Sequence, residues 1–436
     1  MNKNVNSNSF RNIRKHFSGR FYFSLFVIIS AVVSLFAAYF TRGEIVGQLL
    51  FPNCDAYFSD FFDSVYDSSL PNPYVTRKVI YPALIYIFYS IIVWFVPKET
   101  VLGGSHAIRN SQCGQMIFHI YCVVLVVAIL FVLLKLMDSG DIVTKIFCVS
   151  VIIGCPFIYA YERGNSILVS LLFMLLFFCY KDSDSKAMRE LSLIFLAIAA
   201  VIKIYPAIFG LLLIAEKRLA EALRCVIYGI AVFALPFFLY GGPKGIVYMF
   251  KNILKLSGTF GEQYGFQVSI RHALSYISKV AGLGLADYTS YFAATITAVL
   301  AVSFLLTRQY YKRILSLTLI CILVPGFNWL YALVYLIPAM VIYFKDNPKM
   351  SGSRIYGVCF ILIFCWYPIN IVKRFPKLSV KNFAPLYEIT LGVIICNIAL
   401  FVLALALLVG SVKEVIYRIY NKNRNNYRRR TADISY

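Results

Sequence analysis

The stretch ITLGVIICNIALFVLALALLV at residues 389–409 decides the fold class. A second stretch, VVLVVAILFVLL at residues 123–134, has the same character, because both carry apolar residues on every face of a helix. A transmembrane α-helix needs about 20 mainly apolar residues, whereas a membrane β-barrel alternates apolar and polar residues in segments of about ten. Both stretches therefore predict transmembrane α-helices and argue against a barrel.

Composition extends this prediction to the whole chain. Of its 436 residues, 60% are hydrophobic and only 14% are charged, against about 25% charged in an average soluble domain. This balance excludes an ordinary soluble protein. Apolar segments recur near residues 21–40, 115–137, 143–161, 165–180, 188–203, 206–216, 222–240, 288–307, 314–327, 328–344, 354–371 and 386–411. We expect an all-α polytopic membrane protein with about twelve transmembrane helices, within a range of about eleven to thirteen.

The basic residues predict the orientation of these helices. A net charge of +22 would suggest nucleic acid in a soluble protein, but here Lys and Arg lie in loops and tails, so we expect no nucleic-acid partner. Basic segments near span ends are expected in the cytoplasm, and they are residues 1–20, 181–189, 216–224, 308–313, 345–354 and 412–436. The positive tail at 422–430 should meet anionic membrane lipids.

This orientation gives a simple domain organisation. Residues 1–20 form a cytoplasmic N-tail, residues 21–411 a single transmembrane domain, and residues 412–436 a cytoplasmic C-tail. The main external loops are then residues 42–114 and 241–287. We expect polar chemistry to concentrate on this external side.

One apolar run does not fit a simple alternation of sides. If residues 79–96 crossed the membrane, the basic loops after them would have to be translocated. We therefore expect the segment to lie in the outer interface, since it is rich in Tyr and Trp. A thirteenth span, compensated by one continuous helix over residues 190–216, is the alternative. Proline at position 206 instead favours two short helices that meet at a break near Lys203.

Cysteines and sequence motifs indicate neither a metal nor a cofactor. Nine of the 11 cysteines lie singly in apolar runs, where they are expected to be small core residues. Cys54 and Cys113 would share the external side, and whether they pair is left open. The chain has no phosphate-binding glycine loop, no HExxH and no CxxC. With 4 scattered histidines, we expect no metal site.

The first external loop is acidic in a basic protein. It carries Asp55, Asp60, Asp63 and Asp67 before the basic pair at residues 77–78. One interpretation is a solvated loop whose charges aid solubility. The other is that one carboxylate acts as a general base over a cavity that faces lipid.

Cations and amides recur in the later external segments. Arg163, Lys203 and Arg271 are the main candidates, and Asn328 with Trp329 lies between two apolar segments. An ionisable group at membrane depth costs about 3 kcal/mol on insertion scales, so it usually has a partner or a function. Such cations can snorkel or form salt bridges, or they can bind a phosphate at the membrane boundary.

In their order along the chain, six short motifs resemble those of polyprenol-phosphate-dependent glycosyltransferases of the GT-C superfamily. The match is closest to glycosyltransferase family 87, whose known members include mannosyltransferases. It extends over roughly residues 20–345. The motifs are DFF at 60–62, NPY at 72–74, YPAL at 81–84, ERGN at 162–165, KIYP at 203–206 and NWLY at 328–331.

The resemblance implies a GT-C-like fold with membrane-parallel helices and a catalytic aspartate in the first loop. Asp60 matches that aspartate, with Asp55 as the second candidate. Further roles are implied for two groups of residues. Arg163, Lys203 and Arg271 would bind the donor phosphate, and Tyr81, Asn165, Tyr205, Asn328 and Trp329 would contact the substrates. The Arg-Gly-Asn sequence lacks the family's usual Gln, so the contacts to the donor sugar stay open.

The implied activity is inverting transfer of a monosaccharide, with mannose-like sugars favoured, from a polyprenyl phosphate to a glycan or glycolipid acceptor. Such an enzyme would work without a cofactor in the cell envelope, on the non-cytoplasmic side of a bacterial inner membrane. Two other activities remain open. A glycan polymerase or ligase would use sugars linked to lipid pyrophosphate, and a flippase would transport lipid-linked sugars.

Overall fold

The computed structural model describes residues 18–50, 57–257, 266–347, 350, 354–378 and 389–433. Within these ranges the chain forms helices and no strand, apart from one isolated β-bridge between Gln267 and Trp329. The expected all-α class is therefore confirmed for the described part of the chain. The α-helices are α2 (Gly19–Phe40), α3 (Ser59–Ser68), α4 (Pro73–Thr76), α5 (Leu84–Val93), α6 (Lys98–Leu102), α7 (Gly104–Asn110), α8 (Gln112–Met137), α9 (Ile142–Ile153), α10 (Cys155–Glu162), α11 (Ile167–Tyr180), α12 (Lys186–Ile202), α13 (Gly210–Ala215), α14 (Leu219–Ala234), α15 (Gly242–Ser257), α16 (Ile270–Ala281), α17 (Thr289–Leu306), α18 (Tyr310–Leu323), α19 (Ile337–Asp346), α20 (Arg354–Phe364), α21 (Ile371–Arg374) and α22 (Leu391–Asp433).

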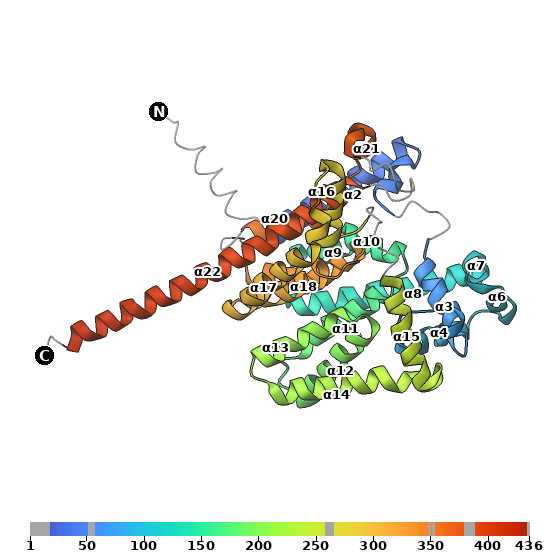
Figure 1. The fold of residues 1–436 in the computed structure, drawn as a ribbon, viewed down its shortest axis with the longest axis horizontal. Coiled ribbons are helices and arrows are strands. Elements are labelled where there is room, and N and C mark those ends of the chain that lie inside the picture. The colour runs from blue at the N-terminus through green and yellow to red at the C-terminus, as the bar shows by residue number, and fades with distance from the viewer. Residues whose placement is uncertain are drawn as a thin grey trace.

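Short 3-10 helices join several of these elements. They are η1 (Glu44–Gln48), η3 (Tyr205–Phe209), η4 (Leu235–Leu239), η5 (Leu285–Tyr288), η6 (Leu330–Leu336) and η7 (Pro376–Leu378). Figure 1 shows the main helices packed side by side, with α3, α4, α6 and α7 gathered at one end of the bundle. The C-terminal part of α22 projects beyond the opposite end.

The expected number of about twelve spans is not confirmed. Among the described residues, 5 helices are long and apolar enough to cross a membrane, or up to 6 if the bent pair α9 and α10 is one span. The 5 are α2, α8, α14 with η4, η5 with α17, and α22. The other predicted segments form shorter helices, such as α11 with 14 residues and α20 with 11.

Glycine and proline account for two of the interruptions. Between α9 and α10 the axis bends by 47°, where Gly154 caps the second helix and Pro156 lies in its first turn. Helix α12 ends at Lys203, whose backbone is extended with φ −140° and ψ 122°. The predicted break between two short helices is thus confirmed, and a continuous helix over residues 190–216 does not form.

Ion pairs join the basic connections at one end of the bundle, which we call the basic end. At this end Arg20, in the first turn of α2, lies 3.5 Å from Asp141, the N-cap of α9. Lys181, after α11, lies 2.9 Å from Glu216, after α13, and its ammonium lies 4.8 Å from the centre of the Tyr310 ring of α18. Residues from three segments predicted to share one side, namely 181–189, 216–224 and 308–313, therefore lie together.

The opposite end of the bundle carries the helices of the first loop. Helix α5 has 10 residues and is only about 15 Å long, about half the thickness of the hydrocarbon core. By itself it is too short to cross a bilayer, in agreement with the interfacial interpretation of residues 79–96. Cys113 donates to the Phe95 carbonyl at 3.2 Å. Cys54 lies outside the described residues, so its pairing stays open.

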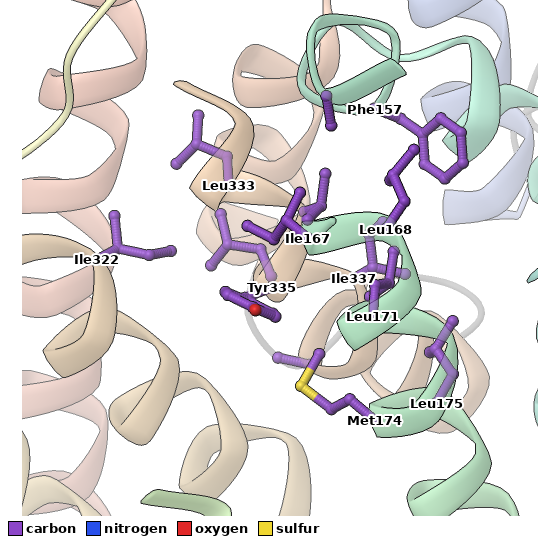
Figure 2. Packing of buried hydrophobic residues seen from close by; sticks show 14 of the residues in the cluster. Phe157, Ile167, Leu168, Leu171, Met174, Leu175, Ile322, Leu333, Tyr335 and Ile337 are labelled. Carbon is purple, nitrogen blue, oxygen red and sulfur yellow. The ribbon is translucent and has the colours of Figure 1, made fainter. Parts of the chain in front are cut away.

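The core is centred on α11, which has no exposed residue. Figure 2 shows its side chains packed against residues of η6 and the start of α19. The labelled residues include Ile167, Leu168, Leu171, Met174 and Leu175 of α11, and Leu333, Tyr335 and Ile337 of η6 and α19. Ser170 donates to the Ala199 carbonyl at 2.9 Å and accepts from the Tyr335 hydroxyl at 3.0 Å. This packing fixes the start of α11, where the predicted Arg163 and Asn165 lie.

Candidate active site

The first loop docks onto the turn between α10 and α11 through the backbone. The Phe58 amide donates to the Glu162 carbonyl at 2.9 Å, and the Asp60 amide donates to the Arg163 carbonyl at 3.2 Å. The Phe58 ring packs 4.1 Å from that of Phe118 in α8. These contacts bring Asp60, in the first turn of α3, beside Arg163, which lies 103 positions later in the sequence.

Gly164 allows this close approach. It has a φ of +63°, and a Cβ at this position would lie 2.7 Å from the Phe61 Cβ. A left-handed backbone is costly for residues other than glycine. The glycine of the predicted ERGN motif is therefore required for two reasons: its backbone is left-handed, and the absence of a side chain leaves room for Phe61.

Replacing Gly164 with alanine should destabilise the protein by about 2–5 kcal/mol, from the left-handed backbone and from overpacking against Phe61. Thermal unfolding of the purified protein measures this loss. Gly282→Ala is the matched control, since Gly282 has a φ of +68° but nothing within 4 Å of its Cβ position. Equal losses in both variants would show that packing against Phe61 does not matter.

Two residues of the same turn hold the Asp60 carboxylate. Arg163 Nη2 lies 2.7 Å from Oδ1, and Asn165 Nδ2 lies 2.6 Å from Oδ2. Asn165 Oδ1 in turn accepts from the Ile167 amide at 2.9 Å, which leaves its NH2 group to face the aspartate. Asn165 is buried, whereas 23% of the Asp60 side chain and 16% of the Arg163 side chain are exposed. A carboxylate is thus held in one orientation at the edge of the solvent.

Lys203 lies at the break after α12, beside the first loop. Its ammonium lies 3.1 Å from the Tyr81 hydroxyl and 4.3 Å from the centre of the Tyr81 ring. It also lies 5.8 Å from the centre of the Tyr331 ring in η6. The extended backbone at Lys203 therefore directs its side chain toward two tyrosines.

Tyr331 connects Lys203 with the Asp60–Arg163 pair. Its hydroxyl interacts electrostatically with Asp60, Arg163 and Tyr81. Tyr331 therefore lies beside Lys203 and within electrostatic reach of the predicted carboxylate and of Arg163. We call the set Asp60, Arg163, Asn165, Tyr81, Lys203 and Tyr331 the candidate site.

The structure places the other predicted residues around this set. Asn328 is buried, and its NH2 group donates to the Cys321 and Ile322 carbonyls at 2.9 and 2.8 Å, which caps the end of α18. Trp329 forms the bridge to Gln267. The Tyr205 ring lies 6.1 Å from that of Tyr335. Their predicted contacts with substrate stay predictions.

Two further predicted residues are not part of the candidate site as the structure describes it. Arg271 is exposed on α16, and its Nη1 lies 3.4 Å from the Cβ position of Gly326. Asp55, the second candidate for the base, lies outside the described residues. Among the described residues, no group of three His, Cys, Asp or Glu side chains could hold a metal ion.

Sequence reasoning did not assign roles to two tyrosines at the site. Tyr331 lies within the quoted NWLY motif, and Tyr159 lies four residues before Arg163, on the same face of α10. The Tyr159 ring is stacked 5.3 Å from Phe266 and 6.2 Å from Tyr331. The helical spacing from Arg163 is the signal that could have identified Tyr159.

A second acid of the first loop, Asp67, is buried at the end of α3. Arg77 Nε lies 3.2 Å from its carboxylate. Burial raises the pKa of Asp67 to about 6, although Arg77 acts to lower it. This pKa in the folded protein lies above the value of about 3.9 for an aspartate in an unfolded chain. Protonated Asp67 therefore favours the folded state at low pH, and this contribution to the free energy of unfolding is lost as the pH rises from about 4 through 6.

Asp67→Asn should therefore raise the melting temperature relative to the wild-type protein more at pH 8 than at pH 4. The two-unit shift corresponds to about 3 kcal/mol at high pH. Thermal unfolding at both pH values measures the difference. Asp63→Asn is the control, since Asp63 also pairs with Arg77, at 3.3 Å, but is exposed. An Asp67→Asn effect that does not vary with pH would contradict the prediction.

Comparison with known families gives one match. The model of glycosyltransferase family 87 matches residues 114–334. The match includes Arg163, Asn165, Lys203 and Tyr331, and it begins after the first loop with Asp60. No curated protein and no solved structure matches the chain. Because the family model covers half of the sequence, the chain belongs to glycosyltransferase family 87, a family of GT-C-type membrane glycosyltransferases.

Proposed function

We propose that this glycosyltransferase moves a monosaccharide from a polyprenyl phosphate to a glycan or glycolipid acceptor, with inversion at the anomeric carbon. One observation carries the proposal. The Asp60 carboxylate is oriented by Arg163 at 2.7 Å and Asn165 at 2.6 Å, in the same set as Lys203. A candidate base is thus paired with one cation, and a second cation lies beside Tyr331 of the same set.

Asp60 would act as the general base. A carboxylate offers about four lone-pair positions, so the bonds from Arg163 and Asn165 leave room for an acceptor hydroxyl. As that hydroxyl attacks the anomeric carbon, its proton passes to Asp60. The new bond joins the acceptor oxygen to the sugar, and the bond from the sugar to the phosphate oxygen breaks.

Arg163 and Lys203 would stabilise the departing lipid phosphate. A guanidinium can bind phosphate oxygens in pairs, and an ammonium binds them as a point charge. Arg163 is held by its ion pair with Asp60 and Lys203 lies 5.8 Å from the Tyr331 ring, so both would need little reorganisation when charge builds up on the leaving group.

The depth of the site supports a lipid-linked donor. Helix α11 runs from the site to the basic end with 14 residues, which is about 21 Å and less than the hydrocarbon core of about 30 Å. This length supports a position for the turn before α11 at a depth that a phosphate on a membrane-embedded prenyl chain can reach. If the basic end faces the cytoplasm, transfer takes place on the outer side, as on a bacterial inner membrane.

Purified protein incubated with polyprenyl-phosphate monosaccharides, including the mannosyl compound, tests this function. We expect release of the lipid monophosphate when a glycan or glycolipid acceptor is added. Polyprenyl-pyrophosphate oligosaccharides serve as the contrasting substrates. Turnover of these compounds alone would contradict the proposal and favour a polymerase or ligase.

Lys203→Ala should weaken binding of the donor lipid by about tenfold to a hundredfold, because a hydrogen bond to a charged group contributes about 1.5–3 kcal/mol. Binding of the donor in detergent or nanodiscs measures the change. Lys251→Ala is the matched control, since Lys251 lies 5.9 Å from the Tyr248 ring but outside the site. Unchanged affinity in the Lys203 variant would give this lysine a purely structural role.

A further inference from the structure

Tyr159 has a buried hydroxyl that lacks a partner. The residue is 0% exposed, and its hydroxyl makes no hydrogen bond to the part of the chain that the structure describes. Leaving a polar group buried and unpaired is costly, and most buried polar groups in proteins are paired. Other buried tyrosine hydroxyls, such as that of Tyr86, also lack a partner, but the one of Tyr159 lies beside the candidate site, where a ligand is expected to bind.

The position of this hydroxyl is fixed by its surroundings. The Tyr159 ring is stacked 5.3 Å from Phe266 at an interplanar angle of 14°, and 6.2 Å from Tyr331 at 27°. Phe266 is itself held by its carbonyl, which accepts from the Leu330 amide at 2.7 Å. The stack restrains the ring, so the hydroxyl cannot easily turn elsewhere for a partner.

The charges around the hydroxyl indicate the chemistry of the ligand. Among the charges near the Tyr159 hydroxyl, Arg163 contributes most, ahead of the carboxylates of Glu162 and Asp60. Arg163 caps α10 and follows Tyr159 by one helical turn. A phenol hydroxyl donates a hydrogen bond, and a neighbouring guanidinium attracts an anion. An anionic oxygen beside Arg163 satisfies both groups.

We propose that Tyr159 donates a hydrogen bond to a phosphate oxygen of the donor lipid, next to the same phosphate's contact with Arg163. This inference rests on the proposed function and adds a residue to the phosphate-binding set. Because the hydroxyl is already removed from water, its bond to phosphate does not have to replace a bond to solvent.

The test is Tyr159→Phe, which removes only the hydroxyl and keeps the stacked ring. We expect binding of polyprenyl phosphate without a sugar to weaken by about tenfold. The melting temperature of the unliganded variant should equal or exceed that of the wild-type protein, because an unpaired buried group is lost.

Tyr335→Phe provides the structural comparison, since the Tyr335 hydroxyl already bonds Ser170 at 3.0 Å. It should lower the melting temperature and leave lipid affinity unchanged. A lower melting temperature for Tyr159→Phe would indicate a structural role and overturn the inference. If Tyr159→Phe weakens binding of the sugar-bearing donor but not of polyprenyl phosphate, the inference is also overturned, because the hydroxyl would then contact the sugar.

Failure of this inference and failure of the proposed function give different results. If the wild-type protein binds polyprenyl phosphate and Tyr159→Phe binds it equally well, only the role of Tyr159 is wrong. If the wild-type protein does not bind polyprenyl phosphate, the proposed donor itself is wrong.

Discussion

Replacing Asp60 with asparagine should reduce sugar transfer by about 10²–10⁴-fold, the usual contribution of a general base. Asparagine has nearly the same shape and keeps one acceptor oxygen, but it cannot take the proton of the acceptor hydroxyl. Release of lipid phosphate from the polyprenyl-phosphate sugar measures the loss. Folding and donor binding should persist, because the backbone bond from Asp60 to the Arg163 carbonyl does not depend on the side chain.

Two variants make this result specific. Asp63→Asn removes a carboxylate three residues away that pairs with Arg77 at 3.3 Å, and it should leave turnover near the wild-type rate. Asp55→Asn examines the second candidate in the same loop. Near-normal turnover of Asp60→Asn together with loss in Asp55→Asn would transfer the role of base to Asp55.

Local signals in the sequence predicted the break at the site. Proline at position 206 and the charge of Lys203 within an apolar run indicated where α12 ends, and the backbone changes direction at Lys203. The basic loops likewise predicted that Lys181, Glu216 and Tyr310 lie at one end, because charge near span ends governs topology. These features depend on residues that are close together in the sequence.

The pairing of Asp60 with Arg163 could be expected only from the order of the family motifs. The two residues are separated by 103 positions, and no local pattern indicates that their side chains meet. Tyr159 was harder to recognise, since it is one of 32 tyrosines in a chain with 37 phenylalanines. Its stacking on Phe266 and its unpaired hydroxyl are properties of tertiary packing.

The number of spans stays a prediction, because length and composition of the described helices do not confirm it. Apolar segments report burial in lipid or protein, and in this fold a segment such as α11 is apolar because other helices surround it. The sequence distinguishes poorly between such a central helix and a full transmembrane span. Bends such as that of 47° between α9 and α10 add to the difficulty.

The second large effect is expected for Arg163. Arg163→Gln should reduce turnover by about 10²–10³-fold, the usual cost of losing one preorganised donor to developing charge. The variant removes the cation that orients Asp60 at 2.7 Å and would bind the departing phosphate. Turnover and donor affinity, measured on the same preparation as the melting temperature, separate these roles from stability.

Arg163→Lys is the informative companion because it keeps the positive charge but loses the planar fork. If the charge alone matters, the lysine variant retains most of the activity. If Arg163 must contact Asp60 and the phosphate together, the lysine variant loses at least about tenfold in turnover, since one ammonium cannot reproduce that paired geometry. Wild-type turnover in the glutamine variant would contradict both roles and leave Lys203 as the cation for the leaving group.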